Sequence, residues 1–478
     1  MDFSYASYLK HPVFKVLAKY ADENKLEVFV IGGWVRDLLL NRPSKDIDIL
    51  VLGDGPTLAS AVAQILKVKK VSIFKNYGTA HFRYKDLDVE FVGARKESYT
   101  TNSRNPITQS GTLQDDQNRR DFTINSMAIG LNAHNFGQLI DPFNGQTDLE
   151  KGIIRTPLDP SITYNDDPLR MLRAIRFATR FNFTIEGKSL EAMKQLSERL
   201  SIISQERITE ELNKIMLTEQ PSRGFKLLQA TGLLAQFFPE MIALMGIETK
   251  DGKAHKDNFY HTLEVLDNIA EHTDKLWLRW AALLHDIAKP PTKRFDKEVG
   301  WTFHGHEDLG AKMVPRIFKR LRLPLDHQMK YVQKLVRLHL RPIALVKGSV
   351  TDTAIRRLLH EAGDDIDDLM TLCNADITSK NEFKVKKYKQ NFELVAEKLK
   401  MVEEKDRVRN FQPPVTGQLI MDTFGIGPCS EIGTIKTQIK DAILDGTINN
   451  DYNEALAEML RLGDALGLKV VKQPLLVE

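Results

Sequence analysis

The sequence has few cysteines and no long uninterrupted run of apolar residues. Cys373 and Cys429 are the only cysteines among 478 residues, which excludes a disulfide framework and a cysteine-rich zinc site. Every apolar stretch is shorter than the roughly 18 residues that a membrane-spanning helix needs, so we expect no membrane partner. The first residues lack a basic region followed by an apolar one and do not predict secretion. Together these absences predict a cytoplasmic protein.

The chain also lacks a strong charge imbalance. Its formal net charge is +3, which is too small to indicate RNA binding on its own, so any basic surface must be local. Hydrophobic residues make up 42% and charged residues 27%, as is typical of a globular protein with a substantial core. A chain of 478 residues is too long for one ordinary domain and predicts three or four units.

The pattern of helix and strand changes along the chain. The N-terminal part alternates the two and predicts a small mixed sheet backed by helices, whereas amphipathic helices dominate from Asp166 onward. The fold class is therefore α+β. We predict four segments, which are a head at 1–140, a neck at 141–245, a histidine-rich helical domain at 246–383 and a helical tail at 384–478.

The strongest motif is a pair of glycines followed by two alternating aspartates. Gly32 and Gly33 fall between a predicted strand and a predicted helix, where backbone N–H groups can approach an anion. Asp46 and Asp48 alternate with isoleucines on the next strand, so their carboxylates share one face. Two such charges ~4 Å apart repel by about 4 kcal/mol at an effective dielectric near 20. A pair of divalent cations relieves this repulsion, and two-metal sites recur in nucleotidyl transfer.

A third carboxylate is expected on a neighbouring strand. Asp88 and Glu90 lie on one face of the segment LDVEFV, and either can complete the site. Arg36 follows the glycine pair, and its bidentate guanidinium suits a phosphate contact. The alternative for Arg36 is an ordinary charge on the surface of a helix.

Several longer segments carry a family resemblance. The sequence contains, in this order, GGWVRD, KDIDIL, GTAHFRY, EFVGAR, RRDFTINSMAI, DPFNGQTDL and DDPLRMLRAIRFATRF. Together they resemble the head and neck of the class II tRNA nucleotidyltransferases, the CCA-adding enzymes, which share a family with bacterial poly(A) polymerases. The resemblance covers nearly the whole chain. It implies that Asp46 and Asp48 hold Mg²⁺, and the family's Glu-x-x-x-x-Arg pattern aligns with Glu90 and Arg95, which favours Glu90 as the third carboxylate.

The resemblance also implies nucleotide contacts further along the head. Two adjacent arginines beside an aspartate suit triphosphate and ribose contacts, and a surface salt bridge at a helix start is the alternative. The residues to which the family pattern assigns this role are Arg119, Asp121 and Asn125, together with the glycine pair.

A second motif opens a predicted neck helix. Asp167 and Arg170 are three residues apart and can share a helix face, although an acid at a helix start is also an ordinary dipole partner. C and A both present an amine beside a ring nitrogen, so one carboxylate and one guanidinium could read either base. The segment is similar to the family's Glu-Asp-x-x-Arg motif, which performs this reading, with Asp166 in place of the motif's Glu. Arg173, one turn further, is a candidate for the same role.

The third motif lies in the histidine-rich segment. His261, the His285-Asp286 doublet and Asp376 resemble the H…HD…D pattern of HD phosphohydrolases. Imidazole and carboxylate donors suit Ni²⁺, Mn²⁺, Fe²⁺ or Co²⁺. The resemblance implies a phosphatase or 2′,3′-cyclic phosphodiesterase, and the alternative is a vestigial HD fold retained for packing and RNA contact. His304, His306 and His339 also lie between the doublet and the last aspartate.

The resemblance implies a tRNA nucleotidyltransferase that adds the 3′-terminal CCA from CTP and ATP without a nucleic-acid template. Its partners would be tRNA, CTP and ATP, its cofactor Mg²⁺, and the chain would be a monomer or homodimer. A polar segment at 96–118 predicts a long functional loop. The resemblance implies that this loop favours full CCA addition, because family members that add only CC tend to lack it. A poly(A) polymerase, or an enzyme that adds only CC or only A, is the nearest rival. An HD phosphohydrolase with an RNA-binding head, or a non-catalytic tRNA-binding module, is the rival from another class.

A tRNA substrate also requires contacts to phosphates. The sequence offers the arginines near Arg207 and a lysine cluster, Lys384, Lys386, Lys387 and Lys389. For each of these lysines the alternative is a solvated helix face.

Overall fold

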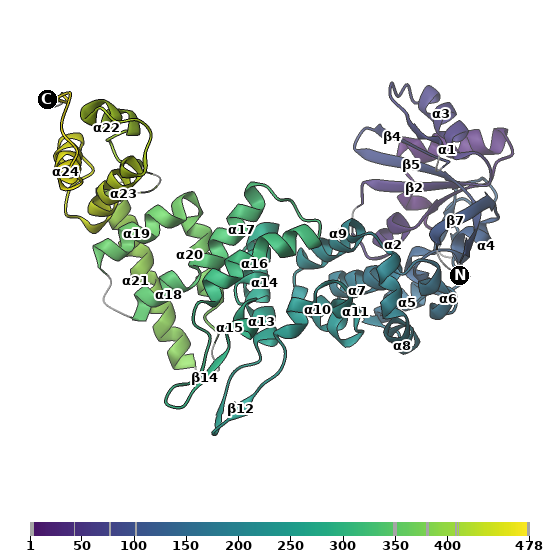
Figure 1. Cartoon of the computed structure of the whole chain (residues 1–478). Coiled ribbons are helices and arrows are strands. Elements are labelled where there is room, and N and C mark those ends of the chain that lie inside the picture. Colours follow the sequence, from purple (N-terminus) through teal and green to yellow (C-terminus); the bar gives the residue numbers. More distant parts are fainter. Residues whose placement is uncertain are drawn as a thin grey trace. The chain divides into compact units, whose positions relative to one another are not determined.

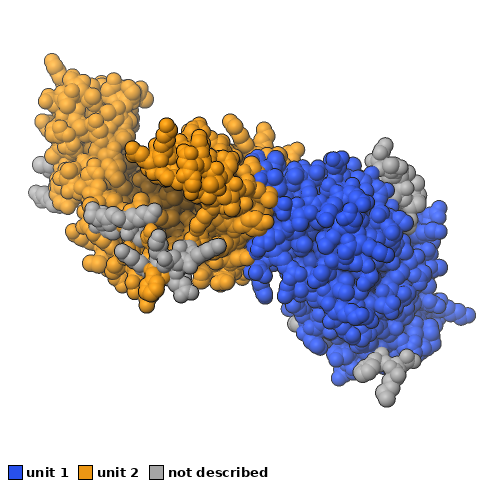
Figure 2. Space-filling view, turned by 90° about the horizontal axis from the view of Figure 1, so that it is seen from below, with its two compact units in different colours: residues 1–242 blue, residues 243–478 orange. Residues whose placement is uncertain are grey.

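The computed structural model describes most of the chain. The described residues are 4–42, 44–75, 78–100, 103–347, 351–378, 382–406, 409 and 411–475, and for 97–100, 103–107, 346–347, 382, 384–385, 387, 389 and 406 the description is limited to the backbone. The chain divides into two compact units, residues 1–242 and residues 243–478 (Figures 1 and 2).

A seven-stranded mixed sheet forms the head of the first unit. Its strand order is β3-β4-β5-β2-β1-β8-β9, and β2 and β5 are parallel while all other neighbours are antiparallel. The strands are β1 (Val28–Ile31), β2 (Asp46–Val51), β3 (Ser72–Phe74), β4 (Thr79–Tyr84), β5 (Leu87–Gly93), β8 (Ala128–Gly130) and β9 (Leu139–Ile140). The predicted small mixed sheet is confirmed.

Helices cover the apolar face of this sheet. Helix α1 (Pro12–Glu23) packs on α3 (Gly55–Ile65), and α3 also contacts β4 and β5 (Figure 1). Ile47 and Ile49 of β2 are buried, and the aspartates that alternate with them therefore project from the opposite face. Helix α2 (Gly33–Leu39) follows β1 after the single turn residue Gly32.

The polar segment predicted as a loop instead forms a hairpin and a helix. Strands β6 (Arg95–Thr100) and β7 (Ser103–Ser110) pair antiparallel, and α4 (Leu113–Asn118) follows. A capping box between Thr112 and Asp115 fixes the start of α4. The loop prediction for residues 96–118 is wrong because a polar composition is shared by loops and by small two-stranded ribbons, in which Thr and Tyr are favoured.

A group of helices completes the first unit. They are α5 (Gly145–Lys151), α6 (Pro160–Asp166), α7 (Leu169–Phe181), α8 (Gly187–Leu196), α9 (Gln205–Met216), α10 (Pro221–Ala230) and α11 (Leu233–Phe237), with the short parallel strands β10 (Ile153–Ile154) and β11 (Thr184–Ile185). Helix α7 is buried along most of its length and packs against α9 and α10. Phe122 of the head meets Phe177 of α7 edge to face, with ring centroids 5.8 Å apart.

The second unit is mostly helical. Its helices include α13 (Asn258–Ala270), α14 (Leu276–Leu284), α15 (Lys289–Thr292), α16 (His306–Arg320), α17 (His327–Leu338), α18 (Leu340–Lys347), α19 (Asp352–Ala362), α20 (Ile366–Ala375), α21 (Glu382–Asp406), α22 (Gly417–Phe424), α23 (Ser430–Asp445) and α24 (Tyr452–Ala465). Two hairpins, β12 (Thr249–Lys250) with β13 (Lys253–Ala254) and β14 (Arg294–Asp296) with β15 (Gly300–Thr302), were not predicted. In the described part of the chain, no helix combines the length and the apolar character needed to cross a membrane.

Candidate functional site

Two adjacent strands of the head bring the predicted carboxylates together. The parallel register of β2 and β5 places Asp48 opposite Glu90 and Asp46 opposite Asp88. Register partners on neighbouring strands point to the same face, so all four carboxylates lie on the face away from the buried isoleucines. On the other side of β2, the antiparallel strand β1 ends opposite Asp48. The glycine turn that follows β1 therefore lies beside the carboxylates.

The structure separates the two candidates for the third carboxylate. Asp88 Oδ1 lies 3.2 Å from His81 Nε2, whereas Glu90 faces Asp48 across the strands. Burial and then the charge of Asp48 raise the pKa of Glu90. Burial also raises the pKa of Asp48, with Asp46 adding to the effect and Arg120 opposing it. A cluster of oxygen donors that are this costly to ionise together fits Mg²⁺, which prefers carboxylate ligands.

Gly32 is required by the geometry of the turn. Its φ is +75°, and a Cβ atom would lie 2.9 Å from Arg120 Nη1 and 3.2 Å from Asp48 Oδ2. A side chain at this position would therefore collide with the site as well as strain the backbone. Gly33 begins α2 directly beside it, so the backbone of the glycine pair approaches the carboxylates closely.

Sequence reasoning missed Asp116, which fixes the two head arginines. The Asp116 side chain is fully buried, and its two oxygens accept from Arg119 Nε at 2.9 Å and from Arg120 Nε at 3.0 Å. The signal that could have found it is the spacing of three and four residues to two arginines, which favours pairing on a helix. The contact with Asp116 of α4 holds Arg120 beside the glycine turn.

Arg36 is not the helix-surface charge that was the alternative. It is 5% exposed, and its guanidinium carbon lies 5.1 Å and 5.0 Å from the ring centroids of Phe177 and Phe181. It donates to Asn125 Oδ1 at 2.7 Å and pairs with Asp37 at 2.8 Å. Burial lowers the pKa of Arg36, while Asp37 opposes that change. The contacts described make Arg36 a support for Asn125.

Asp121 and Asn125 belong to the same buried network. Asp121 accepts from Asn125 Nδ2 at 2.9 Å and from Arg173 Nε and Nη2 at 2.8 and 2.6 Å. Although burial works against ionisation, Arg173 and Asn125 together hold the pKa of Asp121 at about 2. The predicted Arg173 therefore ties α7 to the head.

Asp167 and Arg170 lie at the start of α7 but have different partners. Arg170 Nη2 donates to the Arg119 carbonyl at 2.5 Å, and the side chain is 9% exposed. Asp167 Oδ1 accepts from the Leu169 backbone N–H at 3.1 Å, and its Oδ2 lies 4.0 Å from Arg207 Nη2. Arg207 comes from α9, so no local spacing could have predicted this pair.

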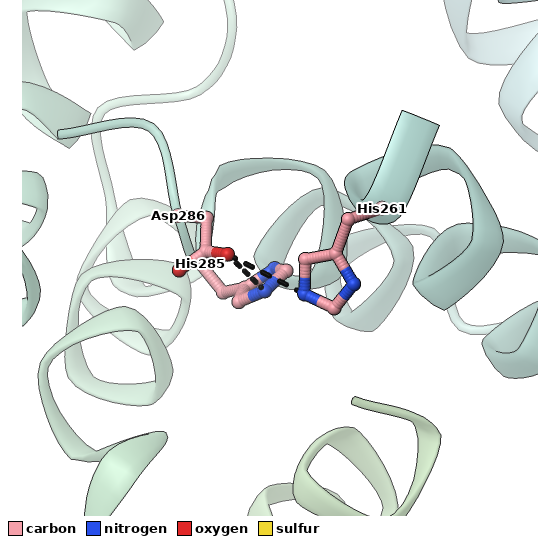
Figure 3. A group of neighbouring side chains, drawn as sticks. All are labelled: His261, His285 and Asp286. Carbon is pink, nitrogen blue, oxygen red and sulfur yellow. Dashed lines mark ion pairs between the residues drawn. The ribbon is translucent and has the colours of Figure 1, made fainter. Parts of the chain in front are cut away.

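A second cluster of titratable residues lies in the second unit. His261 comes from α13, while His285 and Asp286 directly follow α14, and Figure 3 shows the two imidazoles and the carboxylate facing one another. Asp286 Oδ2 lies 3.5 Å from His261 Nε2 and 3.2 Å from His285 Nε2 (Figure 3). Asp376, after α20, places Oδ1 3.0 Å from His261 Nε2. The structure thus brings all four predicted HD residues together.

Two of the intervening histidines join this cluster. His306 Nε2 and His339 Nε2 lie 3.3 and 3.9 Å from Asp286 Oδ1, whereas His304 is exposed. His285, His306 and His339 each donate from Nδ1 to the carbonyl three residues earlier, at 2.7 Å. This bond leaves each Nε2 pointing inward, which is the usual arrangement of metal-binding histidines.

The imidazoles and carboxylates of the cluster shift one another's pKa values. Although burial works against it, Asp286 and Asp376 raise the pKa of His285 to about 10. Burial and the charge of His285 lower the pKa of His339 to about 4, which keeps that imidazole neutral. Lys289 Nζ lies 2.6 Å from Asp286 Oδ2. Inward-facing imidazole nitrogens beside carboxylate oxygens are donors that fit a divalent transition metal.

The fold and the first site define a class of protein. A mixed sheet whose adjacent strands present a glycine turn and clustered carboxylates is a nucleotidyltransferase head, and the helical histidine–aspartate cluster is that of an HD domain. Matches to known families agree with both. Residues 28–155 match the poly A polymerase head domain, residues 182–245 match a probable RNA and SrmB-binding site of polymerase A, and residues 258–381 match the HD domain.

Similar proteins extend these matches over most of the chain. A multifunctional CCA protein from Nitrosococcus oceani is 33% identical over 386 residues, which is 77% of this chain and 89% of the relative. An A-adding tRNA nucleotidyltransferase from Deinococcus radiodurans is 30% identical over 426 residues, or 86% and 90% of the two chains. The chain therefore belongs to the class II tRNA nucleotidyltransferase and bacterial poly(A) polymerase family, and it is a nucleotidyltransferase that also carries an HD domain.

Solved structures share the fold. A CCA-adding enzyme in an apo form has a TM-score of 0.63 and 25% identity over 95% of this chain and 97% of its own. The Thermotoga maritima CCA-adding enzyme, solved with tRNA, has a TM-score of 0.60 and 23% identity over 95% and 97% of the two chains.

The predicted RNA-binding lysines fall on α21. Lys386 is exposed there, while the side chains of Lys384, Lys387 and Lys389 lie outside the described residues.

Proposed function

We propose that this enzyme adds the 3′-terminal CCA to tRNA from CTP and ATP without a nucleic-acid template. The observation that carries the proposal is the register of β2 and β5, in which Asp48 and Glu90 face each other beside the glycine turn and Asp46. Relatives named for CCA and A addition match most of the chain, and a structural neighbour was solved with tRNA. Others were solved with ATP and with CTP.

Asp46, Asp48 and Glu90 are the residues that would hold Mg²⁺. With Mg²⁺ held there, the pKa of the attacking hydroxyl would be lowered and the charge of the departing pyrophosphate would be neutralised. The tRNA 3′-oxygen attacks the α-phosphorus in line, so that a 3′-O–P bond forms while the bond to the bridging oxygen of the β-phosphate breaks. The 3′-hydroxyl proton leaves to solvent. The backbone of Gly32 and Gly33, with Arg119, contacts the triphosphate.

The neck would select the base. Asp167 and Arg170 are proposed to accept from and donate to the Watson–Crick edge of C or A, with Arg207 beside Asp167. Arg36, Asn125, Asp121 and Arg173 support this surface through their buried contacts.

The experiment that tests the proposal is nucleotide incorporation into tRNA transcripts ending before CCA, after C and after CC. Labelled CTP or ATP is supplied and the products are sized. Addition of C, C and A in order supports CCA addition. Addition of A alone to the CC-ended transcript identifies an A-adding enzyme, as the Deinococcus radiodurans relative is named. Addition of C alone identifies a CC-adding enzyme. A long A tail identifies a poly(A) polymerase.

A second function is proposed for the HD domain, namely a metal-dependent phosphatase or 2′,3′-cyclic phosphodiesterase. The cluster of His261, His285, Asp286 and Asp376, of which His285 and Asp286 are buried, favours it over a vestigial fold. Inward-facing imidazoles have no packing role that apolar residues would not fill better. Hydrolysis of a cyclic phosphate with Ni²⁺, Mn²⁺, Fe²⁺ or Co²⁺ tests it. His285→Gln with Asp286→Asn should abolish hydrolysis, and activity that survives this double change would refute the site.

The four predicted segments complete the proposal. We assign residues 1–140 to catalysis, 141–245 to base selection, 246–383 to hydrolysis and 384–478, with Lys386 at its start, to the tRNA. A cytoplasmic location and a monomer or homodimer stay predictions.

A further inference from the structure

We propose that a cavity in the second unit binds a nucleoside phosphate. The cavity has a volume of about 530 Å³, which is within the range of pockets that enclose small molecules. It is lined by residues at the beginnings of α14, α17 and α20. The inference goes beyond both proposed activities, because it assigns a ligand to residues that neither of them uses.

The same three helices separate the cavity from the HD cluster. Their opposite ends are followed by His285, His339 and Asp376, which belong to that cluster. The helices contain 9, 12 and 10 residues, so at a rise of ~1.5 Å per residue they span roughly 13–18 Å. None of the residues that line the cavity is part of the HD cluster. The cavity is therefore a second, distinct place at which the unit can hold a ligand.

The charged side chains around the cavity leave an excess of positive charge. Its charged lining consists of Lys275, Lys330, Lys334, Asp365 and Asp368. Lys275 Nζ lies 2.8 Å from Asp368 Oδ1, and Lys334 Nζ lies 2.6 Å from Asp365 Oδ2. Lys330 is exposed and forms no ion pair within the described part of the chain. Both carboxylates are thus neutralised, and the third lysine is available to an anion.

The beginnings of the three helices add to this positive potential. The peptide dipoles of a helix place a partial positive charge at its N-terminus, and here three N-termini meet at one cavity. Neither α14 nor α20 has a side chain that caps its first turn. Backbone N–H groups at such helix starts can donate to a phosphate.

Aromatic side chains line the same cavity. Trp277 of α14 and Tyr331 of α17 are half-buried there, beside the buried Leu278. The Trp277 ring packs on Phe318 with the ring centroids 5.9 Å apart, which restricts the indole. The Tyr331 hydroxyl donates to Asp368 Oδ2 at 2.8 Å, which restricts the phenol. Restricted aromatic rings beside a lysine suit a ligand that joins a flat base to a phosphate.

The shape of the site favours a free mononucleotide over an RNA strand. An RNA strand requires a positive groove that follows several successive phosphates, whereas these residues surround a single cavity. We expect the base to lie against Trp277 and the phosphate to lie beside Lys330.

The test is the binding of AMP to the full-length chain, measured by isothermal titration calorimetry in the presence of a chelator. The chelator removes the divalent ions through which the head and the HD cluster would otherwise hold a phosphate. We expect one AMP per chain. AMP should bind more tightly than adenosine or ribose 5-phosphate, because the first lacks the phosphate and the second lacks the base.

Two variants test the cavity itself. Trp277→Leu should weaken AMP binding by about tenfold or more, within the range of a lost contact between a base and an aromatic ring. Lys330→Gln should weaken AMP binding by about threefold to fivefold, as expected for an exposed ion pair, and should leave adenosine binding unchanged. Arg337→Gln is the matched control, because it removes the same charge from the last turn of α17, outside the cavity.

The variants must be folded for this comparison. An unchanged circular dichroism spectrum and melting temperature show that each of them is. If Trp277→Leu does not fold, Lys330→Gln decides the question, because the Lys330 side chain is exposed.

Arg170→Ala distinguishes the cavity from the proposed base-reading surface of the neck, and it should keep full AMP binding. Weaker AMP binding in the cavity variants, with Arg337→Gln and Arg170→Ala unchanged, supports the inference. AMP binding that is lost in Arg170→Ala but kept in the cavity variants would overturn it. Absence of AMP binding, or equal binding of AMP and ribose 5-phosphate, would overturn it as well. Nucleotidyl transfer and cyclic-phosphate hydrolysis are measured separately, so these outcomes leave both proposed activities standing.

Discussion

The head and the HD domain both gather acidic side chains, but they do so in opposite ways. The head places Asp46, Asp48 and Glu90 on two neighbouring strands, and two of the three side chains are exposed. The HD cluster collects buried and half-buried residues from the ends and interiors of helices that are distant in the sequence. Oxygen donors at an open surface suit an ion that arrives with a nucleotide, whereas buried imidazoles suit a resident ion.

The charges of the two clusters differ accordingly. In the head, loss of hydration raises the pKa values of Asp48 and Glu90, and repulsion from a neighbouring carboxylate, Asp46 for Asp48 and Asp48 for Glu90, adds to the effect. In the HD cluster, although burial works against ionisation, His285 and Lys289 hold the pKa of Asp286 well below its usual range. Removing a carboxylate therefore relieves repulsion in the head but leaves uncompensated positive charge in the HD domain.

The sharpest test of this contrast is Asp48→Asn. We expect nucleotidyl transfer to fall by about 10²–10³-fold, since the loss of an electrostatic contact to the reacting groups has effects of this size. Stability should be unchanged or slightly higher, because a repelled charge is removed. Incorporation kinetics and thermal unfolding measure both, and Asp88→Asn is the matched control with a much smaller loss of activity. Clear destabilisation by Asp48→Asn would contradict the contrast.

The reverse outcome is expected for Asp286→Asn. Breaking a buried, ion-paired network typically costs about 3–5 kcal/mol, so the second unit should unfold at a markedly lower temperature. Hydrolysis should be lost while nucleotidyl transfer at moderate temperature is retained. Calorimetry with and without a chelator measures this, and a wild type whose transition ignores the chelator would argue against a resident metal.

Acid should weaken the first unit through Asp121. Its folded pKa of about 2 lies below the usual 3.8, so its ionised form stabilises the fold at neutral pH and that contribution disappears as the pH falls from about 4 to 2. The difference corresponds to about 2 kcal/mol. Urea unfolding of the wild type and Asp121→Asn should therefore differ most at pH 7 and converge near pH 2. Asp86→Asn, at an exposed turn, should show no such convergence.

The smallest expected effect concerns base choice. Arg170→Ala should reduce the preference for C and A over U and G by about tenfold, within the range of one lost bidentate base contact, and should lower total turnover less. Incorporation assays with all four nucleotides measure the ratio. Because Arg170 also donates to the Arg119 carbonyl, Arg170→Lys serves as the control that keeps a charge. Unchanged selectivity in Arg170→Ala would exclude it from base reading.

The contrast between the two sites also explains what the sequence could predict. Gly32, Asp46 and Asp48 are close in the sequence, and the spacing of two residues between the aspartates alone indicates that they share a face of the strand. The choice between Asp88 and Glu90 needs the register with β2, which no local pattern contains. The hairpin at residues 95–110 was missed because its composition is that of a loop.

Other contacts depend on helices meeting in three dimensions. Arg207 reaches Asp167 from α9, and His306 and His339 reach Asp286 from two further helices. The sequence shows these residues but not their neighbours. Residue spacing can predict site residues that lie on one strand or helix. It cannot predict which residues of separate helices come together, because that depends on how the helices pack.

The double attachment of α7 has a consequence for the growing RNA. Arg170 bonds the Arg119 carbonyl and Arg173 bonds Asp121, so the helix proposed to read bases is fastened to the segment proposed to hold the triphosphate. Both contacts would have to break before one surface could slide past the other. On the proposed function, the RNA terminus must therefore move back by one nucleotide after each addition. The base-reading helix and the triphosphate-binding segment keep their positions while the RNA moves.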